Sequence, residues 1–187
     1  MISGCIRQTI CGLDELATLH SSATHVLSIL DPDFPDPYCT AAEEFQVRLY
    51  LRFHDIIKPE PGLIAPEPHH ISALLAFGRG LGPGDASHLL VHCHMGVSRS
   101  PAAMAALLAQ ANPDADEQAL ISHIADLRPQ AWPNLLMVAL ADEQLHRGGR
   151  LVAALKPLYE SQIRGNPALA DQMTRYGRTA EVELAMS

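Results

Sequence analysis

A strand, a short loop and a helix follow one another between residues 87 and 110, and this order constrains the fold more than any other part of the sequence. Residues 87–92 (SHLLVH) form a short apolar run, which is typical of a buried strand. Residues 100–110 are rich in alanine, and Pro101 suits the first turn of a helix, where a missing N–H costs little. The loop between them would gather backbone N–H groups at a helix N-terminus, which favours an anion there.

The rest of the chain alternates strand-like and helix-like segments. Proline-rich stretches at 31–40 and 57–68 predict loops. Strands joined by helices predict an α/β fold, with a mostly parallel central sheet flanked by helices and a helical C-terminal half. The further segments expected are strands at 24–30 and 47–53, and helices at 12–20, 68–80, 114–127, 133–147 and 151–163.

The length of 187 residues suits one domain with its own core. We expect this single domain to cover residues 1–164. Residues 165–187 are polar, with Gly165 and Pro167 near their start, and predict a C-terminal tail. Asp114 is the expected N-cap of the helix at 114–127.

The charge balance limits the partners that the chain can bind. The formal net charge is −8, so most of the surface should repel nucleic acid and anionic membranes. No segment reaches the roughly 18 apolar residues of a membrane span, and the N-terminus lacks the apolar core of a signal peptide. We therefore expect a cytoplasmic protein with no nucleic-acid or membrane partner, and any anion site must be local.

The four cysteines are Cys5, Cys11, Cys39 and Cys93. Their spacing matches no CxxC pattern of zinc or redox sites, and we predict no metal. Without an export signal a disulfide framework is not expected. Cys5, Cys11 and Cys39 are interpreted as small buried hydrophobic residues.

Cys93 differs because it ends the strand at 87–92 and is followed by an arginine at the start of the helix. A helix N-terminus favours the thiolate form of a cysteine beside it, and a thiolate is a strong nucleophile. The planar guanidinium of Arg99 can hold two phosphate oxygens at once. Gly96 permits a tight turn of the loop. Ser100 can donate a hydrogen bond to the sulfur of Cys93. This bond should help to expel the thiolate when a covalent intermediate on the sulfur breaks down.

The string HCHMGVSRS at 92–100 resembles the signature loop of the protein tyrosine phosphatases, especially the dual-specificity members. Two other segments agree in order: the strand before Asp31, and Arg128-Pro129 followed by Pro133-Asn134. The resemblance spans about residues 24–145. The arrangement of these segments is also similar to that of small bacterial members of the family. It implies the cysteine-phosphatase fold and hydrolysis of phosphomonoesters through a phosphocysteine on Cys93, without a cofactor.

The resemblance also implies the roles of the loop residues. Cys93 would be the nucleophile and Arg99 the phosphate clamp, with a phosphate or sulfate ion able to sit in the loop. His92 would point inward and form a hydrogen bond with the loop. The substrate-binding residues implied are His94, Met95, Gly96, Val97, Ser98 and Arg99.

The general acid implied by the resemblance is Asp55, which follows the strand at 47–53. A carboxylic acid there would protonate the leaving oxygen. Asp31 and Asp33 remain alternatives, because they follow the strand at 24–30 and should lie at the same edge of the sheet. Asp85 precedes its strand and should lie at the opposite edge.

The loop contains no lysine, which favours a substrate with a single phosphate. Phosphotyrosine, alone or together with phosphoserine and phosphothreonine, is the expected group, carried by a phosphorylated protein or a small phosphomonoester. Two other functions remain open at this point: a rhodanese-like sulfurtransferase, and a non-catalytic module that binds phosphate groups.

Overall fold

The structure, a computed structural model, describes residues 6–19, 22–37, 47–81 and 87–187. Three residues singled out in the sequence, Cys5, Cys39 and Asp85, lie outside these ranges. Within them, no helix is both long and apolar enough to cross a membrane.

The described residues form a four-stranded sheet in the order β1-β4-β2-β3, with every neighbouring pair parallel. The strands are β1 (Arg7–Cys11), β2 (His25–Leu30), β3 (Val47–Arg52) and β4 (His88–His92). This confirms the predicted parallel sheet. Strand β1 was not expected, because its short sequence contains Arg7 and Gln8 and shows no apolar run; it lies at an edge, where polar side chains reach solvent.

The two central strands are buried along their whole length, whereas the edge strands β1 and β3 are partly exposed. Alternate residues of β4 enter two different hydrophobic clusters. Leu89 and Val91 join the main core, and Leu90 packs with Leu16 of helix α1 (Leu13–Leu19) on the other face. The sheet is therefore covered on both faces, as parallel sheets generally are.

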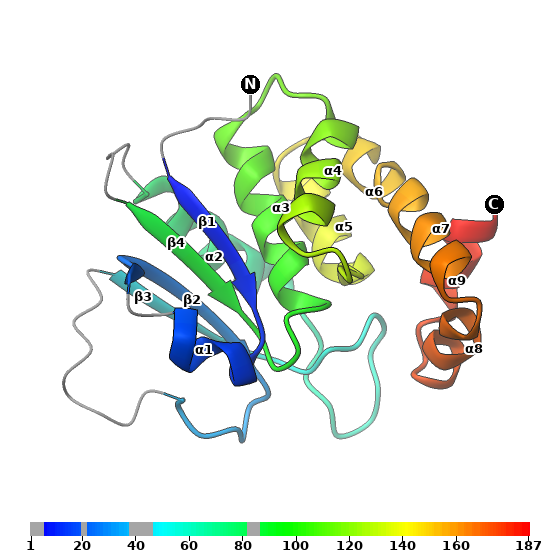
Figure 1. Cartoon of the computed structure of the whole chain (residues 1–187), viewed down its shortest axis with the longest axis horizontal. Coiled ribbons are helices and arrows are strands. Elements are labelled where there is room, and N and C mark those ends of the chain that lie inside the picture. The colour runs from blue at the N-terminus through cyan, green and yellow to red at the C-terminus, as the bar shows by residue number, and fades with distance from the viewer. Residues whose placement is uncertain (1–5, 20–21, 38–46, 82–86) are drawn as a thin grey trace.

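Four helices fill the main core against the sheet: α2 (Pro68–Arg79), α3 (Arg99–Ala111), α4 (Glu117–Leu127) and α5 (Leu135–Gln144). Figure 1 shows α1 in front of the sheet and α2 behind it. Helix α3 is central and contacts the other three. Its residues 99–109 are all buried, as expected of a helix that is apolar on every side. Its alanines leave room for the neighbouring helices to approach.

The helix caps correct one expectation. Asp116, and not Asp114, caps α4 by accepting a hydrogen bond of 3.0 Å from the backbone N–H of Ala119. Asn134 caps α5 and accepts from the backbone N–H of Met137 at 3.0 Å.

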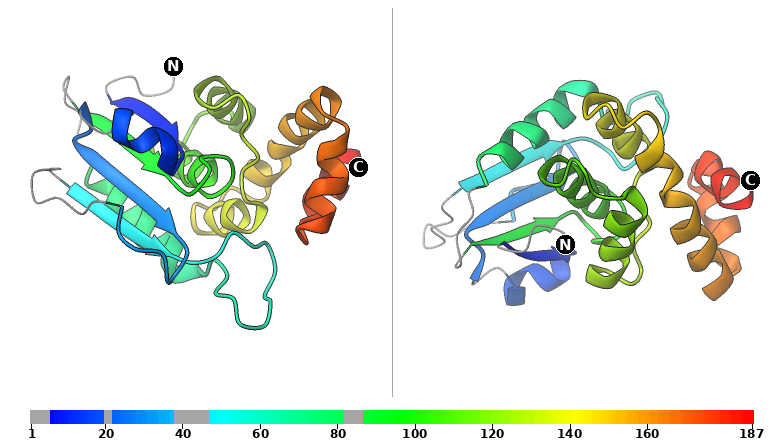
Figure 2. Two further views of the ribbon diagram at one scale, coloured as in Figure 1. Left: turned by 60° about the horizontal axis from the view of Figure 1, so that its bottom comes forward. Right: turned by 90° about the horizontal axis from the view of Figure 1, so that it is seen from above.

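The predicted helix at 151–163 is divided into α6 (Arg150–Ala153) and α7 (Leu155–Gly165). The segment that we predicted as a tail holds two further helices, α8 (Ala168–Arg175) and α9 (Thr179–Met186). Figure 2 shows α7, α8 and α9 together, on the side of the helical layer away from the sheet. Met173 of α8 and Val182 of α9 are buried in the main core cluster.

Candidate active site

The loop between β4 and α3 lies at the carboxyl edge of the sheet, and its carbonyl groups are bound by donors from outside the loop. The carbonyl of His94 accepts from Leu13 N–H at 2.9 Å, and that of Val97 accepts from Trp132 N–H at 2.7 Å. The carbonyl oxygens of Met95 and Gly96 accept from the guanidinium of Arg128 at 3.1 and 3.2 Å. Because the C=O and N–H of a trans peptide unit point in opposite directions, these contacts favour N–H groups that face the inside of the loop.

Gly96 has a backbone conformation that requires glycine. Its φ is +70°, and a Cβ built on it would lie 2.5 Å from the carbonyl carbon of Cys11. A side chain would therefore suffer both backbone strain and a clash with the end of β1. The close approach of Gly96 to β1 gives the loop its tight turn.

Cys93 is buried at the start of the loop and is not part of a disulfide. Its Sγ lies 3.2 Å from the hydroxyl oxygen of Ser100, in the first turn of α3. His92, directly before it, is fully buried, and its Nε2 lies 2.7 Å from the hydroxyl of Ser28. Burial lowers the pKa of His92 to about 4, so its ring is neutral at neutral pH.

Arg99 is the first residue of α3, and its side chain is buried. Its Nη1 donates to a carboxylate oxygen of Asp31 at 2.7 Å and to the carbonyl of Phe53 at 2.6 Å. Its Nε is also buried and has no hydrogen-bond partner among the described residues. An unmet buried N–H is costly. An oxyanion held beside this guanidinium would satisfy it.

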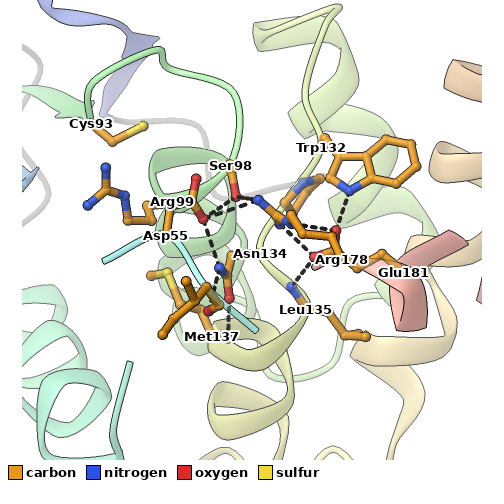
Figure 3. A network of polar contacts seen from close by, with 12 residues as sticks. Asp55, Cys93, Ser98, Arg99, Trp132, Asn134, Leu135, Met137, Arg178 and Glu181 are labelled. Carbon is orange, nitrogen blue, oxygen red and sulfur yellow. Dashed lines mark hydrogen bonds and ion pairs between the residues drawn. The ribbon is translucent and has the colours of Figure 1, made fainter. Parts of the chain in front are cut away.

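Asp55 lies beside the loop, three residues after the end of β3. One of its carboxylate oxygens, Oδ1, accepts from the hydroxyl of Ser98 at 2.7 Å and from the side-chain amide of Asn134 at 2.9 Å. The same oxygen lies 3.2 Å from Nη1 of Arg178, a residue of the C-terminal segment. Figure 3 shows these side chains converging between Cys93 and the C-terminal helices.

Arg178 is held in turn by Glu181 of α9. Its Nε and Nη2 donate to the two carboxylate oxygens of Glu181 at 2.7 and 2.6 Å. Glu181 also accepts from the indole N–H of Trp132 and, at 2.9 Å, from the backbone N–H of Leu135. Trp132 is buried and stacks on Tyr159 of α7, with ring centroids 4.4 Å apart.

A cavity of about 550 Å³ lies between the loop and the C-terminal helices. On one side it is lined by Asp55 and by most of the predicted site residues, which are Cys93, His94, Met95, Val97, Ser98 and Arg99. On the other side, residues of α7 and α8 and Arg178 form its wall. In the described ranges, no three His, Cys, Asp or Glu side chains are grouped so that they could hold a metal ion.

The structure thus brings the predicted residues together, and neither alternative aspartate lines the cavity. Asp31 contacts Arg99, and Asp33 is exposed and does not line the cavity. His94 is partly buried against Phe34, with ring centroids 4.5 Å apart. Arg178 could not be predicted from the sequence, because no motif or spacing links position 178 to the loop.

No protein-family model matches this chain, and no curated protein matches its sequence. Solved structures do match its fold. The phosphatase domain of Yvh1 from Chaetomium thermophilum superposes with a TM-score of 0.52 and 23% identity, over 80% of this chain and 96% of that one. The human tyrosine phosphatase-like serine/threonine/tyrosine-interacting protein gives 0.52 and 18%, over 79% and 89%. Tk-PTP in its active form gives 0.50 and 20%, over 79% and 95%.

These likenesses show the fold. The chain has the α/β fold of the dual-specificity and tyrosine phosphatases, as the loop sequence predicted. The structures that share it include phosphatases and a phosphatase-like interacting protein, so the activity has to be argued from the site itself.

Proposed function

We propose that this protein is a cysteine-dependent phosphomonoester hydrolase that acts on phosphotyrosine, and also on phosphoserine or phosphothreonine where these reach the nucleophile. One observation carries the proposal. Cys93 and Arg99 line the same cavity at a strand-to-helix loop whose carbonyl groups are bound from outside, and the buried Nε of Arg99 has no partner in the described chain. This arrangement provides a nucleophile, an anion cradle and an unmet donor in one place.

In the first step, the thiolate of Cys93 attacks the phosphorus, a P–S bond forms and the bond from phosphorus to the leaving oxygen breaks. The loop N–H groups and Arg99 stabilise the charge on the phosphoryl oxygens. Asp55 gives its proton to the leaving oxygen, so that an alcohol or phenol departs.

In the second step, water attacks the phosphorus of the phosphocysteine and the P–S bond breaks. Asp55, now ionised, takes a proton from that water. The hydroxyl of Ser100, 3.2 Å from the sulfur, can donate a hydrogen bond to the departing thiolate. Inorganic phosphate is released, and the enzyme is back in its starting state, with Cys93 as the thiolate and the proton from water on Asp55.

The site favours a substrate with one phosphate group. Burial lowers the pKa of His94, and the nearby guanidinium of Arg99 lowers it further, so His94 adds little positive charge at neutral pH. Arg178 already bonds Glu181 and Asp55. A second phosphate would therefore find no cation dedicated to it among the described residues that line the cavity.

The contacts of the alternative aspartates support Asp55 as the acid. Asp31 forms an ion pair with Arg99 and does not line the cavity. The contact of Asp31 with Arg99 is suited to orienting the guanidinium that holds the phosphate. Asp33 is exposed and outside the cavity.

The test is turnover by the purified protein. We expect release of phosphate from para-nitrophenyl phosphate and from a phosphotyrosine peptide, and loss of both in Cys93→Ser. Turnover of thiosulfate in place of phosphate esters would instead identify a sulfurtransferase. Binding of the phosphopeptide without turnover by the unmodified chain would identify a non-catalytic binding module, and both results would refute the proposal.

A further inference from the structure

We propose that Arg178, just before helix α9, is a positioning residue that fixes Asp55 so that its transferable proton is carried on Oδ2. The inference rests on the proposed function, in which Asp55 is the general acid. It makes the C-terminal segment a working part of the active site.

The hydrogen bonds to Asp55 are all on one side of its carboxyl group. In the described parts of the chain, Oδ1 accepts from Ser98, Asn134 and Arg178 at 2.7, 2.9 and 3.2 Å. An oxygen that receives three donors has no lone pair left for a proton. A proton on Asp55 therefore sits on Oδ2. The Asp55 side chain is 31% exposed and lines the cavity.

Two of the three guanidinium nitrogens of Arg178 bind Glu181, and the third, Nη1, faces the active site. Its Nε and Nη2 are both bonded to Glu181, in the two-point geometry that fixes a guanidinium plane. The remaining Nη1 lies 2.8 Å from the hydroxyl oxygen of Ser98, as well as 3.2 Å from Asp55. Because Ser98 gives its single hydroxyl proton to Asp55, its oxygen is free to accept from Arg178. Arg178 thus orients Asp55 directly and through Ser98.

Glu181 anchors this arrangement to the same segment that holds the loop. It is fully buried and accepts from Trp132 and Leu135 in addition to Arg178. The backbone of Trp132 binds the carbonyl of Val97 in the loop. A movement of Glu181 would therefore displace both Arg178 and the loop.

Arg178 remains charged in this setting. Burial lowers its pKa, but the carboxylates of Asp55 and Glu181 outweigh burial and raise the pKa above its ordinary value. A lasting positive charge beside the carboxylate of Glu181 allows Arg178 and Glu181 to be buried together.

The experiment compares Arg178→Met, Arg178→Lys, Asp55→Asn and the double variant Arg178→Met/Asp55→Asn with the full-length unmodified chain. Two substrates are used: para-nitrophenyl phosphate, whose leaving group needs little protonation, and phenyl phosphate, whose leaving group needs it more. The matched control is Arg175→Met, which removes an exposed arginine of α8 outside the cavity. Thermal unfolding and vanadate binding of each variant check that the fold and the loop persist.

We expect Arg178→Met to lower kcat for phenyl phosphate by about tenfold more than for para-nitrophenyl phosphate, as loss of a positioned acid should. In the Asp55→Asn background the same change should lower kcat less than about twofold, because the two residues act through one proton. Arg178→Lys should behave like Arg178→Met, since one ammonium cannot keep both contacts with Glu181 and reach the site. Arg175→Met should leave both rates unchanged.

Equal losses on the two substrates, or full additional losses in the Asp55→Asn background, would overturn the positioning role. If Arg178→Met does not fold, normal kinetics of a folded Arg178→Lys would overturn it equally. A failure of the proposed function looks different, because the unmodified chain would then hydrolyse neither ester and the comparison of leaving groups would have no signal.

Discussion

The guanidinium of Arg99 and the carboxylate of Asp31 lie 2.7 Å apart, joining the first turn of α3 to the end of β2. Nη1 of Arg99 is also bonded to the carbonyl of Phe53, at the end of β3. Two strand ends thus fix one nitrogen of the guanidinium, and the buried Nε has no partner among the described residues. The clamp is therefore oriented before any anion arrives.

Arg99→Lys should lower kcat/KM for para-nitrophenyl phosphate by about 100-fold or more. A lysine has one ammonium group, which cannot contact Asp31 and also present a planar pair of donors to a phosphate. Steady-state kinetics measure the loss of turnover, and vanadate inhibition measures the loss of anion binding. Near-normal kinetics in this variant would show that the guanidinium does not clamp the phosphate.

Asp55→Asn should lower kcat by about 100-fold for a phosphoserine peptide, whose alkoxide is a poor leaving group, and much less for para-nitrophenyl phosphate. The amide keeps the shape of the side chain but cannot give up a proton. Asp33→Asn is the matched control, since Asp33 is exposed and outside the cavity. A small and equal effect on both substrates would place the acid elsewhere.

Gly96→Ala should destabilise the protein more than Gly62→Ala, although both glycines have positive φ, +70° and +78°. Both variants carry the strain of a left-handed residue, about 1–2 kcal/mol. Only Gly96 would meet backbone atoms of Cys11 and Gly12, whereas Gly62 has open space. We expect a further loss of roughly 1–3 kcal/mol for Gly96→Ala. Urea unfolding measures it, and equal losses would contradict the close approach.

Stability should fall as the pH drops from 6.5 towards 4, in part because of His92. Burial lowers its pKa in the folded chain from 6.5 to about 4, so in this window the unfolded chain takes up a proton that the folded chain refuses. The stabilisation is present above 6.5 and is lost as the pH falls through 4. By linkage it amounts to about 3 kcal/mol. His92→Gln should flatten the pH profile of urea unfolding by up to that amount.

The control for this comparison is His69→Gln, which removes a histidine whose side chain is 69% exposed. Parallel pH profiles for the unmodified chain and His92→Gln would show that His92 does not contribute to the acid sensitivity.

The loop and its flanking elements could be predicted because their signals are local. An apolar strand, a tight glycine turn and a helix start follow one another within a short stretch, and the order places Cys93 and Arg99 at one site. The role of Asp55 as general acid was implied by the family resemblance and not by the residues around it. The structure places Asp55 at the cavity.

Contacts between distant segments could not be predicted in this way. Arg178 and Asp55 are separated by 123 positions, and neither the composition nor the periodicity of the C-terminal segment indicates that they meet. Strand β1 was missed because its partner β4, and not its own sequence, provides its hydrogen bonds and burial. For α4, Asp114 and Asp116 are both residues of a type that suits an N-cap, and only Asp116 is at the position from which its side chain accepts from the backbone N–H of Ala119.

The central claim is that Cys93 carries the phosphoryl group during turnover. It is tested most directly by quenching the enzyme in acid during hydrolysis of para-nitrophenyl phosphate and mapping the modified peptide by mass spectrometry. We predict one added phosphoryl group on the peptide that contains Cys93, and none on that peptide in Cys93→Ser. Turnover with no phosphorylated cysteine, or with the phosphoryl group on another residue, would contradict the account.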